Sequence, residues 1–537
     1  MVFQLDWDQL NSTIGGRLIQ TVPLGSPCHD PFYDEAECDS LRQEWNFPTL
    51  ASQYPSAIDA PYFQNGTCDP FHPISKPCTL GGLVSYSINA SSVEHVSAGV
   101  EFAQKKNIRL VVKNTGHDYL GKSTGKGALG IWTHHLNSIE SFANYTGPTY
   151  TGPALKIGAG VQAYAAYDAA HELGYRVVGG TCPTVGLAGG YSQGGGHSML
   201  SSQYGLGADN VLEWEVVTAN GTHLVATPAQ NADLYWALSG GGPGTYGVVI
   251  SMTTKMHEES QTGGALLTFN IEPNRTDAFW DAITVLQVGM GPLVDQGMAS
   301  VFEVTNSSVL AIIIAPNQST AEVTDELAFI TNHLDQQQMP YQLSVSTDAT
   351  YYDYFVRYFG PLPEGSYQSA QLTGSRLIPR SVLANATSAA AITNAYRDIV
   401  ANGDWTLGCV AVNASHAVAG NTPAANAVLP AWRTAGIHTI IYSPWDWDAP
   451  ESAMVAREAH LTNSISPRME ALTPGSGTYL NEANFQQKEF QENFYGANYG
   501  RLRSIKKKYD PKDLFYTVTS VGSEAWVLDG EGRLCRP

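Results

Sequence analysis

A glycine-rich segment that contains one cysteine is the part of the sequence whose residue types point most directly to chemistry. Residues 179–210 read GGTCPTVGLAGGYSQGGGHSMLSSQYGLGADN and contain ten glycines. Glycine adopts positive φ and lets the backbone approach a ligand closely, so the segment favours contact with a flat or phosphorylated cofactor, although a tightly packed β-corner would also use it. The thiol of Cys182, set among small residues, is a potential nucleophile or attachment point.

A second segment carries a histidine on a loop that follows a predicted strand. Residues 108–112 (IRLVV) predict a short buried strand, which leads into the turn-rich sequence Lys113–Gly121 with His117 in its middle. Successive backbone N–H groups after a strand can bind a diphosphate. By itself, the loop is equally compatible with a strand-to-strand turn that bears a surface histidine.

Together the two segments resemble the covalent flavoprotein oxidases of the vanillyl-alcohol-oxidase superfamily, in the berberine-bridge-enzyme-like branch. That branch pairs a Gly-His-x-Tyr loop with a downstream Cys-Pro-Thr-(Val/Leu)-Gly, a glycine run and Tyr-Gly-Leu-x-x-Asp-Asn. The corresponding segments here are Gly116–Tyr119, Cys182–Gly186, Gly189–Gly196 and Tyr204–Asn210. The resemblance extends over nearly the whole chain and implies an α+β fold, the two-domain PCMH-type flavoprotein fold. The overall sequence is similar to those of the fungal isoamyl-alcohol-oxidase-like group.

The resemblance also implies how a cofactor is held. It implies FAD bonded to His117 through the flavin 8α-carbon and to Cys182 through C6, with the substrate side of the ring left open to bulky molecules. No metal site is expected. The other residues that the resemblance assigns to the cofactor site are Lys113, Asn114, Thr115, Gly116, Asp118, Gly180, Thr184, Val185, Gly186, Gly189, Gly190, Gly196, His197, Gly205, Asp209, Val211, Val249, Asn498 and Tyr499.

Val185, three residues after the cysteine, bears on the reaction with oxygen. In this family, a valine there leaves a pocket beside the oxygen-reactive carbon of the flavin, whereas leucine closes it. We therefore expect an oxidase that takes a hydride from an alcohol, or from a hydroxylated secondary metabolite or oligosaccharide, and releases hydrogen peroxide. Plain packing of Val185 is compatible with either outcome.

The catalytic base is the point where the sequence departs from the family pattern. Many relatives have Tyr-x-Asn-Tyr near the C-terminus, and this chain has Tyr479-Leu480-Asn481-Glu482. Glu482 is a candidate base, a residue that holds another group in place, or a solvated loop carboxylate. Tyr119 and Tyr479 are further candidates, because the equivalent of Tyr119 faces substrate in the family.

Two other motifs suggest different functions. Residues 242–247 match the dinucleotide pattern G-x-G-x-x-G, but the preceding residues predict a helix and the following ones a strand, the reverse of what that site needs. Residues 190–194 match the hydrolase elbow G-x-S-x-G around Ser192, although the surrounding glycines disfavour the helix that should follow. A serine hydrolase using Ser192 and an inactive extracellular binding protein of the same fold are the alternatives.

Composition and charge limit the partners. The chain has 537 residues, a net charge of −20 and 43% hydrophobic residues, with a pI near 5.0. Nucleic acid and anionic membranes would be repelled, so a small neutral or cationic substrate is expected, and no apolar run approaches the ~20 residues of a membrane helix. Ten Asn-x-Ser/Thr sequons indicate a secreted glycoprotein and a mature form that has lost its signal segment. They begin at Asn11, Asn65, Asn89, Asn144, Asn220, Asn274, Asn306, Asn317, Asn385 and Asn413.

Seven cysteines fit an oxidising compartment, and six of them could pair in any of fifteen connectivities. The ten-residue intervals from Cys28 to Cys38 and from Cys68 to Cys78 predict two local disulfides. A third disulfide between Cys409 and Cys535 would leave Cys182 unpaired. That residue is also the one that the family attaches to the cofactor.

The predicted helices and strands divide the chain into four segments. We expect a disulfide-tied arm with little periodicity (1–75), an FAD-binding domain (76–262), a substrate domain (263–475) and a C-terminal segment that returns to the FAD domain (476–537), in a monomer. Predicted helices cover residues 93–106, 161–173, 232–238, 277–288, 320–333 and the end of 485–510; predicted strands cover 130–133, 155–158, 211–218, 223–226, 248–254, 266–271 and 308–314.

Overall fold

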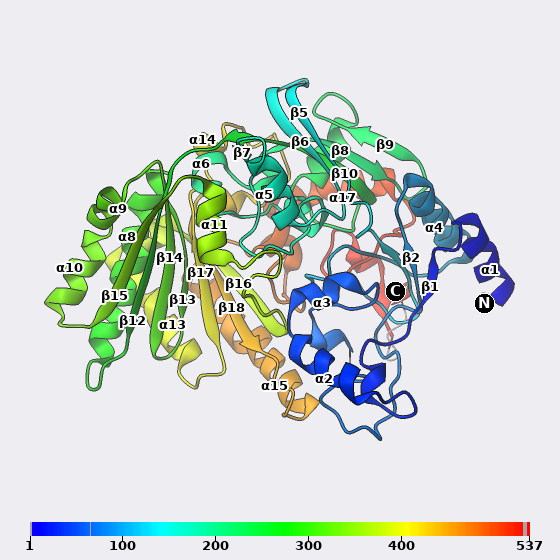
Figure 1. Ribbon diagram of the computed structural model, residues 1–537, viewed down its shortest axis with the longest axis horizontal. Coiled ribbons are helices and arrows are strands. Elements are labelled where there is room, and N and C mark those ends of the chain that lie inside the picture. The colour runs from blue at the N-terminus through cyan, green and yellow to red at the C-terminus, as the bar shows by residue number, and fades with distance from the viewer. Residues whose placement is uncertain (1–2, 65, 530–533) are drawn as a thin grey trace.

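A computed structural model describes residues 3–64, 66–529 and 534–537 of the protein. Helices and sheets are mixed throughout and form two adjoining halves (Figure 1). The light-green to orange part of the chain, from about residue 262 to residue 472, makes up most of one half, and the blue-to-green part before it and the red C-terminal part make up the other. The sequon at Asn65 lies outside the described residues.

A four-stranded sheet delivers the His117 loop. Its order is β1-β2-β4-β3, with β2, β4 and β3 parallel and β1 antiparallel at the edge. Helix α4 (Val93–Lys106) links β2 to β3, and it ends at Asn107 in the left-handed conformation, as the sequence predicts. The strands are β1 Leu18–Gln20, β2 Tyr86–Asn89, β3 Leu110–Lys113 and β4 Leu129–Trp132.

A five-stranded antiparallel sheet follows and is bordered by the glycine-rich segment. Its order is β5-β6-β10-β8-β9. The glycine-rich segment contains a π-helical turn, Leu187–Tyr191, that lies against β10. The strands are β5 Ile139–Thr146, β6 Thr151–Gly158, β8 Val211–Val217, β9 His223–Ala226 and β10 Val248–Lys255; β7 (Tyr175–Arg176) and β11 (His257–Glu258) pair separately.

A seven-stranded antiparallel sheet forms the core of the other half (Figure 1). Its order is β15-β12-β14-β13-β17-β18-β16. Residues alternate between its two faces, so Leu407, Cys409 and Ala411 of β17 join a hydrophobic core under the helices. The strands are β12 Thr262–Asn270, β13 Ala299–Val304, β14 Ser308–Pro316, β15 Tyr341–Asp348, β16 Gln371–Pro379, β17 Thr406–Ala411 and β18 Ala435–Pro444.

Helices α8 and α13 pack on each other and cover one face of this sheet. The opposite face looks toward the other half of the molecule. The remaining helices of the middle of the chain flank the sheet or link its strands. The bounds are α8 Thr276–Asp295, α9 Thr320–Glu326, α10 Ala328–Gln336, α11 Tyr351–Phe359, α12 Arg380–Leu383, α13 Ala386–Val400, α14 His416–Ala419, α15 Glu451–His460 and α16 Ser466–Leu472.

Short helices structure the N-terminal arm, which the sequence analysis expected to lack periodicity. Each spans at most ten residues, so its hydrophobic pattern is too brief to stand out. The arm is joined to the main body by Asp6, whose carboxylate accepts a hydrogen bond from Lys106 at 2.6 Å. The helices are α1 Gln4–Thr13, α2 Glu35–Glu44 and α3 Pro48–Gln53.

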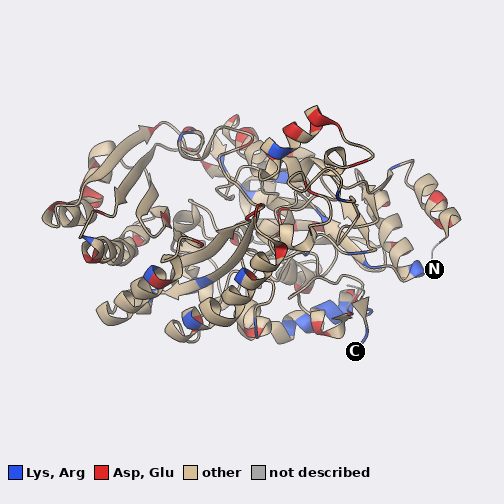
Figure 2. Cartoon of the chain, turned by 90° about the horizontal axis from the view of Figure 1, so that it is seen from below, with Lys and Arg blue, Asp and Glu red and all other residues tan. Residues whose placement is uncertain are grey.

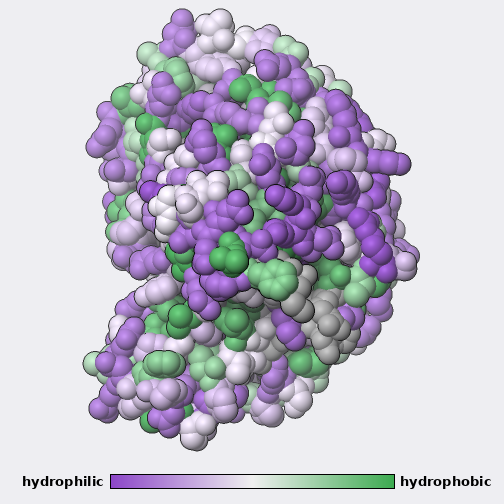
Figure 3. All heavy atoms as spheres, turned by 90° about the vertical axis from the view of Figure 1, so that its right-hand side faces the viewer, coloured by the Kyte–Doolittle hydropathy of each residue, from purple (hydrophilic) through white to green (hydrophobic). Residues whose placement is uncertain are grey.

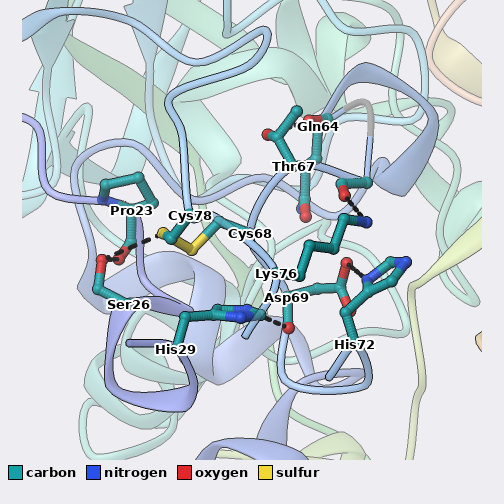
Figure 4. The surroundings of a disulfide bond; sticks show 11 residues. Pro23, Ser26, His29, Gln64, Thr67, Cys68, Asp69, His72, Lys76 and Cys78 are labelled. Atoms are coloured by element: carbon teal, nitrogen blue, oxygen red, sulfur yellow. Dashed lines mark hydrogen bonds and ion pairs between the residues drawn. A yellow bond between two sulfur atoms is a disulfide. The ribbon is translucent and has the colours of Figure 1, made fainter. Parts of the chain in front are cut away.

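Two of the three expected disulfides are present. Cys28 is bonded to Cys38, and Cys68 is bonded to Cys78. Around the second disulfide (Figure 4), the Ser26 hydroxyl lies 3.5 Å from the Cys78 sulfur, and the His29 ring contacts the Asp69 carbonyl at 2.9 Å. The disulfides therefore stabilise the loops of the arm.

The expected disulfide between Cys409 and Cys535 is wrong. Both are free thiols, as is Cys182. Cys409 is fully buried on the helix-covered face of the seven-stranded sheet, whereas Cys535 is exposed near the C-terminus. Counting cysteines therefore does not single out Cys182, whose role has to be argued from its surroundings.

The predicted helix over 320–333 is two helices, α9 and α10, because the chain leaves helical geometry at Leu327. The C-terminal helix α17 (Tyr499–Tyr509) lies at the end of residues 485–510, as predicted, and is preceded by a π-helical turn, Gln491–Tyr495. The predicted helix over 161–173 is α5, Ala163–His171. Two shorter helices complete this half, namely α6 Ser201–Tyr204 and α7 Ala232–Leu238.

The C-terminal segment returns to the first half of the molecule. The ammonium of Lys506 on α17 is buried and donates to the carbonyls of Thr245 and Phe515 and to the carboxylate of Asp510. In Figure 2, basic residues (blue) are grouped close to the C-terminus, and α17 carries the basic sequence RLRSIKKK. The last strand pair is β19 (Val527–Leu528) with β20 (Leu534–Cys535).

Among the described residues, none of the helices combines the length and the hydrophobicity needed to cross a bilayer. The face in Figure 3 is mostly hydrophilic, with hydrophobic side chains scattered between polar ones.

Candidate active site

A cavity of about 710 Å³ lies between the His117 loop, the glycine-rich segment and the seven-stranded sheet. Thr406, Gly408 and Val410 of β17 line it. They lie on the face of the sheet opposite to the one that buries Cys409. Sixteen predicted site residues border the cavity, namely Asn114, Thr115, Gly116, His117, Asp118, Tyr119, Gly180, Cys182, Val185, Gly186, Gly189, Gly190, His197, Val249, Tyr479 and Glu482. The structure thus brings most of the predicted set into one place.

His117 and Cys182 lie side by side on this wall. The Sγ of Cys182 is 3.8 Å from the Nε2 of His117, and Thr184 Oγ1 contacts both, at 2.7 Å from Nε2 and 3.4 Å from Sγ. The loop after β3 carries the imidazole, and the segment after β7 carries the thiol. Two nucleophile-type side chains from distant segments therefore converge on one edge of the cavity.

The histidine is held from the arm side as well. Asp59 Oδ2 lies 3.5 Å from His117 Nδ1, and the Asp59 backbone N–H donates to the Gly116 carbonyl at 2.9 Å. Gly116 has φ +96°, which a residue with a side chain rarely adopts, so the turn that presents His117 requires glycine here. The N-terminal arm is thereby part of the site.

Burial sets the protonation of these groups. It lowers the pKa of His117 to about 4, so the imidazole is neutral at pH 7 and keeps a free lone pair. It raises the pKa of Cys182 to about 11 and that of Asp59 to about 7. A neutral imidazole beside a carboxyl group that titrates near neutrality is suited to act as a nucleophile.

The glycine-rich segment fits a flat ring on its cavity side. A Cβ at Gly190 would have no neighbour nearer than 3.8 Å, and one at Gly180 none nearer than 3.4 Å, although both residues border the cavity. Side chains there would fill cavity space. Gly186 and Gly189 instead pack against the Asn114 side chain, which a Cβ at Gly186 would meet at 2.1 Å and one at Gly189 at 3.0 Å. With the His117–Cys182 pair at its edge, this cradle suits an isoalloxazine ring.

A carboxylate flanked by two imidazoles lies at another part of the wall. Glu482 accepts from His197 Nε2 at 3.1 Å and from His438 Nε2 at 2.8 Å. Burial by itself would raise the pKa of Glu482, but the two imidazoles hold it well below its ordinary value. Glu482 is therefore no solvated loop residue, and it is ionised at neutral pH.

The tyrosines on the wall are fixed by hydrogen bonds. The Tyr479 hydroxyl accepts from the Gly196 N–H at 3.2 Å and from Asn481 Nδ2 at 2.7 Å. The Tyr119 and Tyr367 hydroxyls are hydrogen-bonded to each other, and Gln371 donates to Tyr367 at 3.1 Å. Burial raises the pKa of Tyr119 and of Tyr479, so both phenols stay protonated at neutral pH.

Several residues of the site were missed by the sequence analysis. Asp59, Tyr367 and His438 come from the arm, from the loop before β16 and from β18, in segments without a motif. Only the fold brings them next to His117, Tyr119 and Glu482. Strand β18 reads AGIHTIIYSP, without a regular alternation of polar and apolar residues, so its sequence gives no signal that marks His438.

Other predicted residues do not border the cavity. The buried ammonium of Lys113 donates to the carbonyls of Ala51 and Tyr54 at 2.8 Å. Asp209 forms a buried ion pair with Arg433 at 2.8 Å. Thr184 and Gly196 lie just behind the wall through their bonds to His117 and Tyr479. The remaining ones are Gly205, Val211, Asn498 and Tyr499, which contact other protein groups.

Neither of the other two motifs has the geometry that its function needs. Ser192 is buried and follows the π-helical turn Leu187–Tyr191, with no strand leading into it. The G-x-G-x-x-G sequence of residues 242–247 lies between helix α7 and strand β10, the reverse of a dinucleotide site. The cavity with His117 and Cys182 remains the candidate site.

Similarity to known proteins covers the same regions. Residues 84–227 match the FAD binding domain model, and residues 478–522 match the model of berberine and berberine-like proteins. The chain is 45% identical over 536 residues to VAO-type flavoprotein oxidase VAO615 of Thermothelomyces thermophilus, with 99% of this chain and 93% of that protein covered. It is 46% identical over 537 residues to the bifunctional decalin synthase calF of Penicillium decumbens, with coverage of 99% and 93%.

Two solved structures are also similar to this chain. The crystal structure of VAO-type flavoprotein MtVAO615 from Myceliophthora thermophila C1 has a TM-score of 0.97 at 44% identity, covering 100% of this chain and 98% of that chain. Glucooligosaccharide oxidase from Acremonium strictum, which has a 6-S-cysteinyl, 8α-N1-histidyl FAD, has a TM-score of 0.69 at 20% identity, covering 82% and 92%. At that identity the second likeness concerns the fold alone.

Proposed function

The chain belongs to the VAO-type flavoprotein family of FAD-linked oxidoreductases, and on this premise we propose that it oxidises an alcohol with FAD bonded to His117 and Cys182. The observation that supports the double attachment most directly is the 3.8 Å distance between Cys182 Sγ and His117 Nε2 at the edge of the cavity. When bound, FAD accepts a hydride and passes two electrons to O₂, which yields hydrogen peroxide.

Separate residues of the chain hold the ring, admit O₂ and accept the substrate proton. His117 and Cys182 hold the ring edge, and the open Cβ directions of Gly180 and Gly190 leave space for its plane. Val185 borders the cavity next to Cys182, in keeping with access of O₂ to the ring. The proton of the substrate hydroxyl passes to a group on the wall near Glu482.

The size and lining of the cavity support a bulky substrate. Its sheet side combines apolar and aromatic residues with polar ones, such as Val410, Ile440, Tyr442 and Glu303. The proposed substrate is therefore a hydroxyl-bearing molecule of mixed polarity, in the class of secondary metabolites and oligosaccharides. We assign residues 76–262 to cofactor binding and residues 263–475 to the substrate side.

The location and assembly state form part of the same proposal. Two disulfides in the arm and the many sequons support passage through a secretory pathway. We propose a secreted, N-glycosylated monomer. A mobility shift after glycan removal and the mass in solution by light scattering test these two points.

One experiment tests the activity. The purified protein is precipitated with acid, and the pellet is examined for flavin absorbance; a second sample is screened for peroxide release over alcohols, oligosaccharides and aromatic metabolites. Yellow pellet and peroxide support the proposal. A colourless protein that releases no peroxide contradicts it.

A further inference from the structure

We propose that His197, His438 and Glu482 form a binding site for a divalent transition-metal ion in the wall of the cavity. The three side chains come from the glycine-rich segment, from β18 and from the C-terminal segment. The sequence analysis expected no metal site, and the three residues come together only in the fold. The site is independent of the alcohol oxidation inferred above.

The donor atoms of the three side chains converge. One donor atom of each residue lies within 4.8 Å of the other two, and no other three histidine, cysteine, aspartate or glutamate side chains within the described part of the chain do so. Nε2 of His197 is 3.1 Å from both oxygens of Glu482, and Nε2 of His438 is 2.8 Å from one of them. Ligands of a tetrahedral zinc ion lie about 2.0–2.2 Å from the metal and so about 3.3 Å from one another. The ring–carboxylate distances therefore have to open by only about half an ångström for the donors to face one ion.

The chemical types of the donors select the kind of ion. Two imidazoles and one carboxylate bind zinc in catalytic sites that keep a further position open, and the same set of donors binds Fe²⁺. Ca²⁺ and Mg²⁺ prefer sites made of oxygen ligands alone. The cluster therefore favours a first-row transition ion, and Zn²⁺ is the suitable probe.

The carboxylate of Glu482 has no strongly basic partner. Among the residues that the structure describes, the groups within ion-pair distance of this carboxylate are the two imidazoles, and no lysine or arginine is among them. The Glu482 side chain is only 23% exposed, so water compensates little of its charge. A carboxylate taken out of water is stabilised by a cation or by metal coordination. A divalent ion would supply the positive charge that the protein does not.

The two histidines are carried by backbone that is fixed without a metal. His438 lies inside the seven-stranded sheet, where it is paired with Val410 of β17 and with Leu377 of β16. His197 directly follows Gly196, whose φ of +78° favours glycine and turns the chain at the end of the glycine run. Ligands on a rigid framework keep the geometry that a metal requires.

Aromatic rings surround the imidazoles. The ring of Trp432 lies 5.3 Å from that of His438 and 6.2 Å from that of His197, and the Tyr479 ring lies 5.5 Å from both. Packing orients the imidazoles, because Nδ1 of each is buried without a hydrogen-bond partner. Metal-bound histidines usually donate from their second nitrogen, and loss of that partner weakens metal binding roughly 10–100-fold. We therefore expect a site that a strong chelator can empty.

The cluster has one side toward the cavity. His197 and Glu482 border the cavity, whereas the side chain of His438 is completely buried behind them. An ion bound by all three therefore lies in the cavity wall, with its remaining coordination positions toward the cavity. Those positions take water or an oxygen of a bound molecule, such as a hydroxyl or a carboxylate.

The test uses the full-length holoenzyme without a histidine tag. After treatment with EDTA and dialysis, Zn²⁺ binding is measured by titration calorimetry and by metal analysis of the desalted protein. The variants are Glu482→Gln and His438→Gln. His223→Gln is the matched control, because His223 on β9 also faces a carboxylate, that of Glu215 at 3.6 Å, but lies outside the cavity. Circular dichroism and covalently attached flavin report on folding in every variant.

We expect the native protein and His223→Gln to bind one Zn²⁺ per chain with the same affinity. Glu482→Gln and His438→Gln should each weaken this binding at least about 100-fold, because a lost ligand costs more than a lost partner of a ligand. Less than one tenth of an equivalent of Zn²⁺ in the native protein, or native affinity in both folded variants, would overturn the proposal.

The position of the ion is measured separately. Anomalous scattering at the zinc edge from crystals of the zinc-loaded native protein should give a peak between the three side chains. This measurement decides the matter if a variant fails to fold. A peak elsewhere with none at the cluster, or zinc present in the crystal but not bound in solution, counts against the site. Zinc binding does not require turnover, so failure of the peroxide screen would contradict the oxidation and leave the metal site standing.

Discussion

The sulfur of Cys182 lies 3.8 Å from Nε2 of His117, and the hydroxyl of Thr184 bridges the two. The two residues are 65 positions apart in sequence and come from different elements. A ring whose edge is bonded to both would be fixed at two points. The first prediction follows from this pair.

We expect His117→Ala and Cys182→Ala each to keep flavin through acid precipitation, because one bond remains in each. The double variant should release all of its flavin into the supernatant. Flavin absorbance of pellet and supernatant measures the result. Release of all flavin from native protein would contradict the double attachment, and Cys409→Ala, a buried thiol outside the cavity, serves as the control.

Asp59→Asn should slow the attachment of flavin to His117. The Asp59 carboxyl lies 3.5 Å from His117 Nδ1 and has a pKa raised to about 7 by burial, so it can exchange a proton with the ring. The measurement is the fraction of covalent flavin after incubation of the apoprotein with FAD. Native attachment rates in the variant would remove Asp59 from this role.

The same substitution should change how stability depends on pH. The pKa of Asp59 is raised in the folded state, so its contribution to stability is present below about pH 4 and is lost as the pH rises toward 7. In Asp59→Asn the stability is not lost in this way, because the asparagine side chain does not ionise between pH 4 and pH 7. Relative to the native protein, the variant should gain up to about 4 kcal/mol in unfolding free energy between pH 4 and pH 7. Denaturant unfolding at the two pH values measures the difference.

Gly190→Leu should give a folded protein that binds no flavin. The new side chain has no protein atom nearer than 3.8 Å to its Cβ and would occupy the cavity. Circular dichroism should stay native while flavin absorbance is lost. Gly500→Leu is the matched control, because its Cβ also meets nothing within 4 Å but lies on α17, away from the cavity. Full flavin content in Gly190→Leu would show that the ring lies elsewhere.

Local patterns predicted the elements near the motifs well. The bounds of β9 and α7 agree with the predicted 223–226 and 232–238, because a hairpin turn and a buried helical face mark them. The pattern failed at the break at Leu327, where the chain leaves helical geometry, and at the arm helices, which span at most ten residues and are too short for a clear hydrophobic periodicity.

The same division holds for the site. His117, Cys182 and Glu482 lie in motifs and could be predicted. Asp59 and His438 could not, because each acts through a contact between segments far apart in the chain. Asp209 shows the converse, since a motif residue forms an ion pair with Arg433 instead of bordering the cavity.

Asp209→Asn should destabilise the protein without changing its flavin chemistry. Both partners of the Asp209–Arg433 pair are buried, so the variant leaves an uncompensated charge on Arg433. We expect a loss of about 3–5 kcal/mol in unfolding free energy. The double variant with Arg433→Gln should recover part of it. A changed flavin spectrum with native stability would instead make Asp209 a cofactor residue.

Val185→Leu tests the reaction with oxygen. Val185 borders the cavity two residues before the π-helical turn Leu187–Tyr191 begins, close to Cys182 and Thr184 in the chain. The larger side chain is expected to fill the space through which O₂ reaches the reduced ring. Reoxidation after anaerobic reduction should slow about tenfold or more, a barrier increase of about 1.4 kcal/mol. Reduction by the alcohol should stay native, and Val249→Leu on the same cavity provides a volume control. Equal reoxidation rates in native and Val185→Leu enzyme would mean that Val185 serves packing alone and that O₂ arrives by another route.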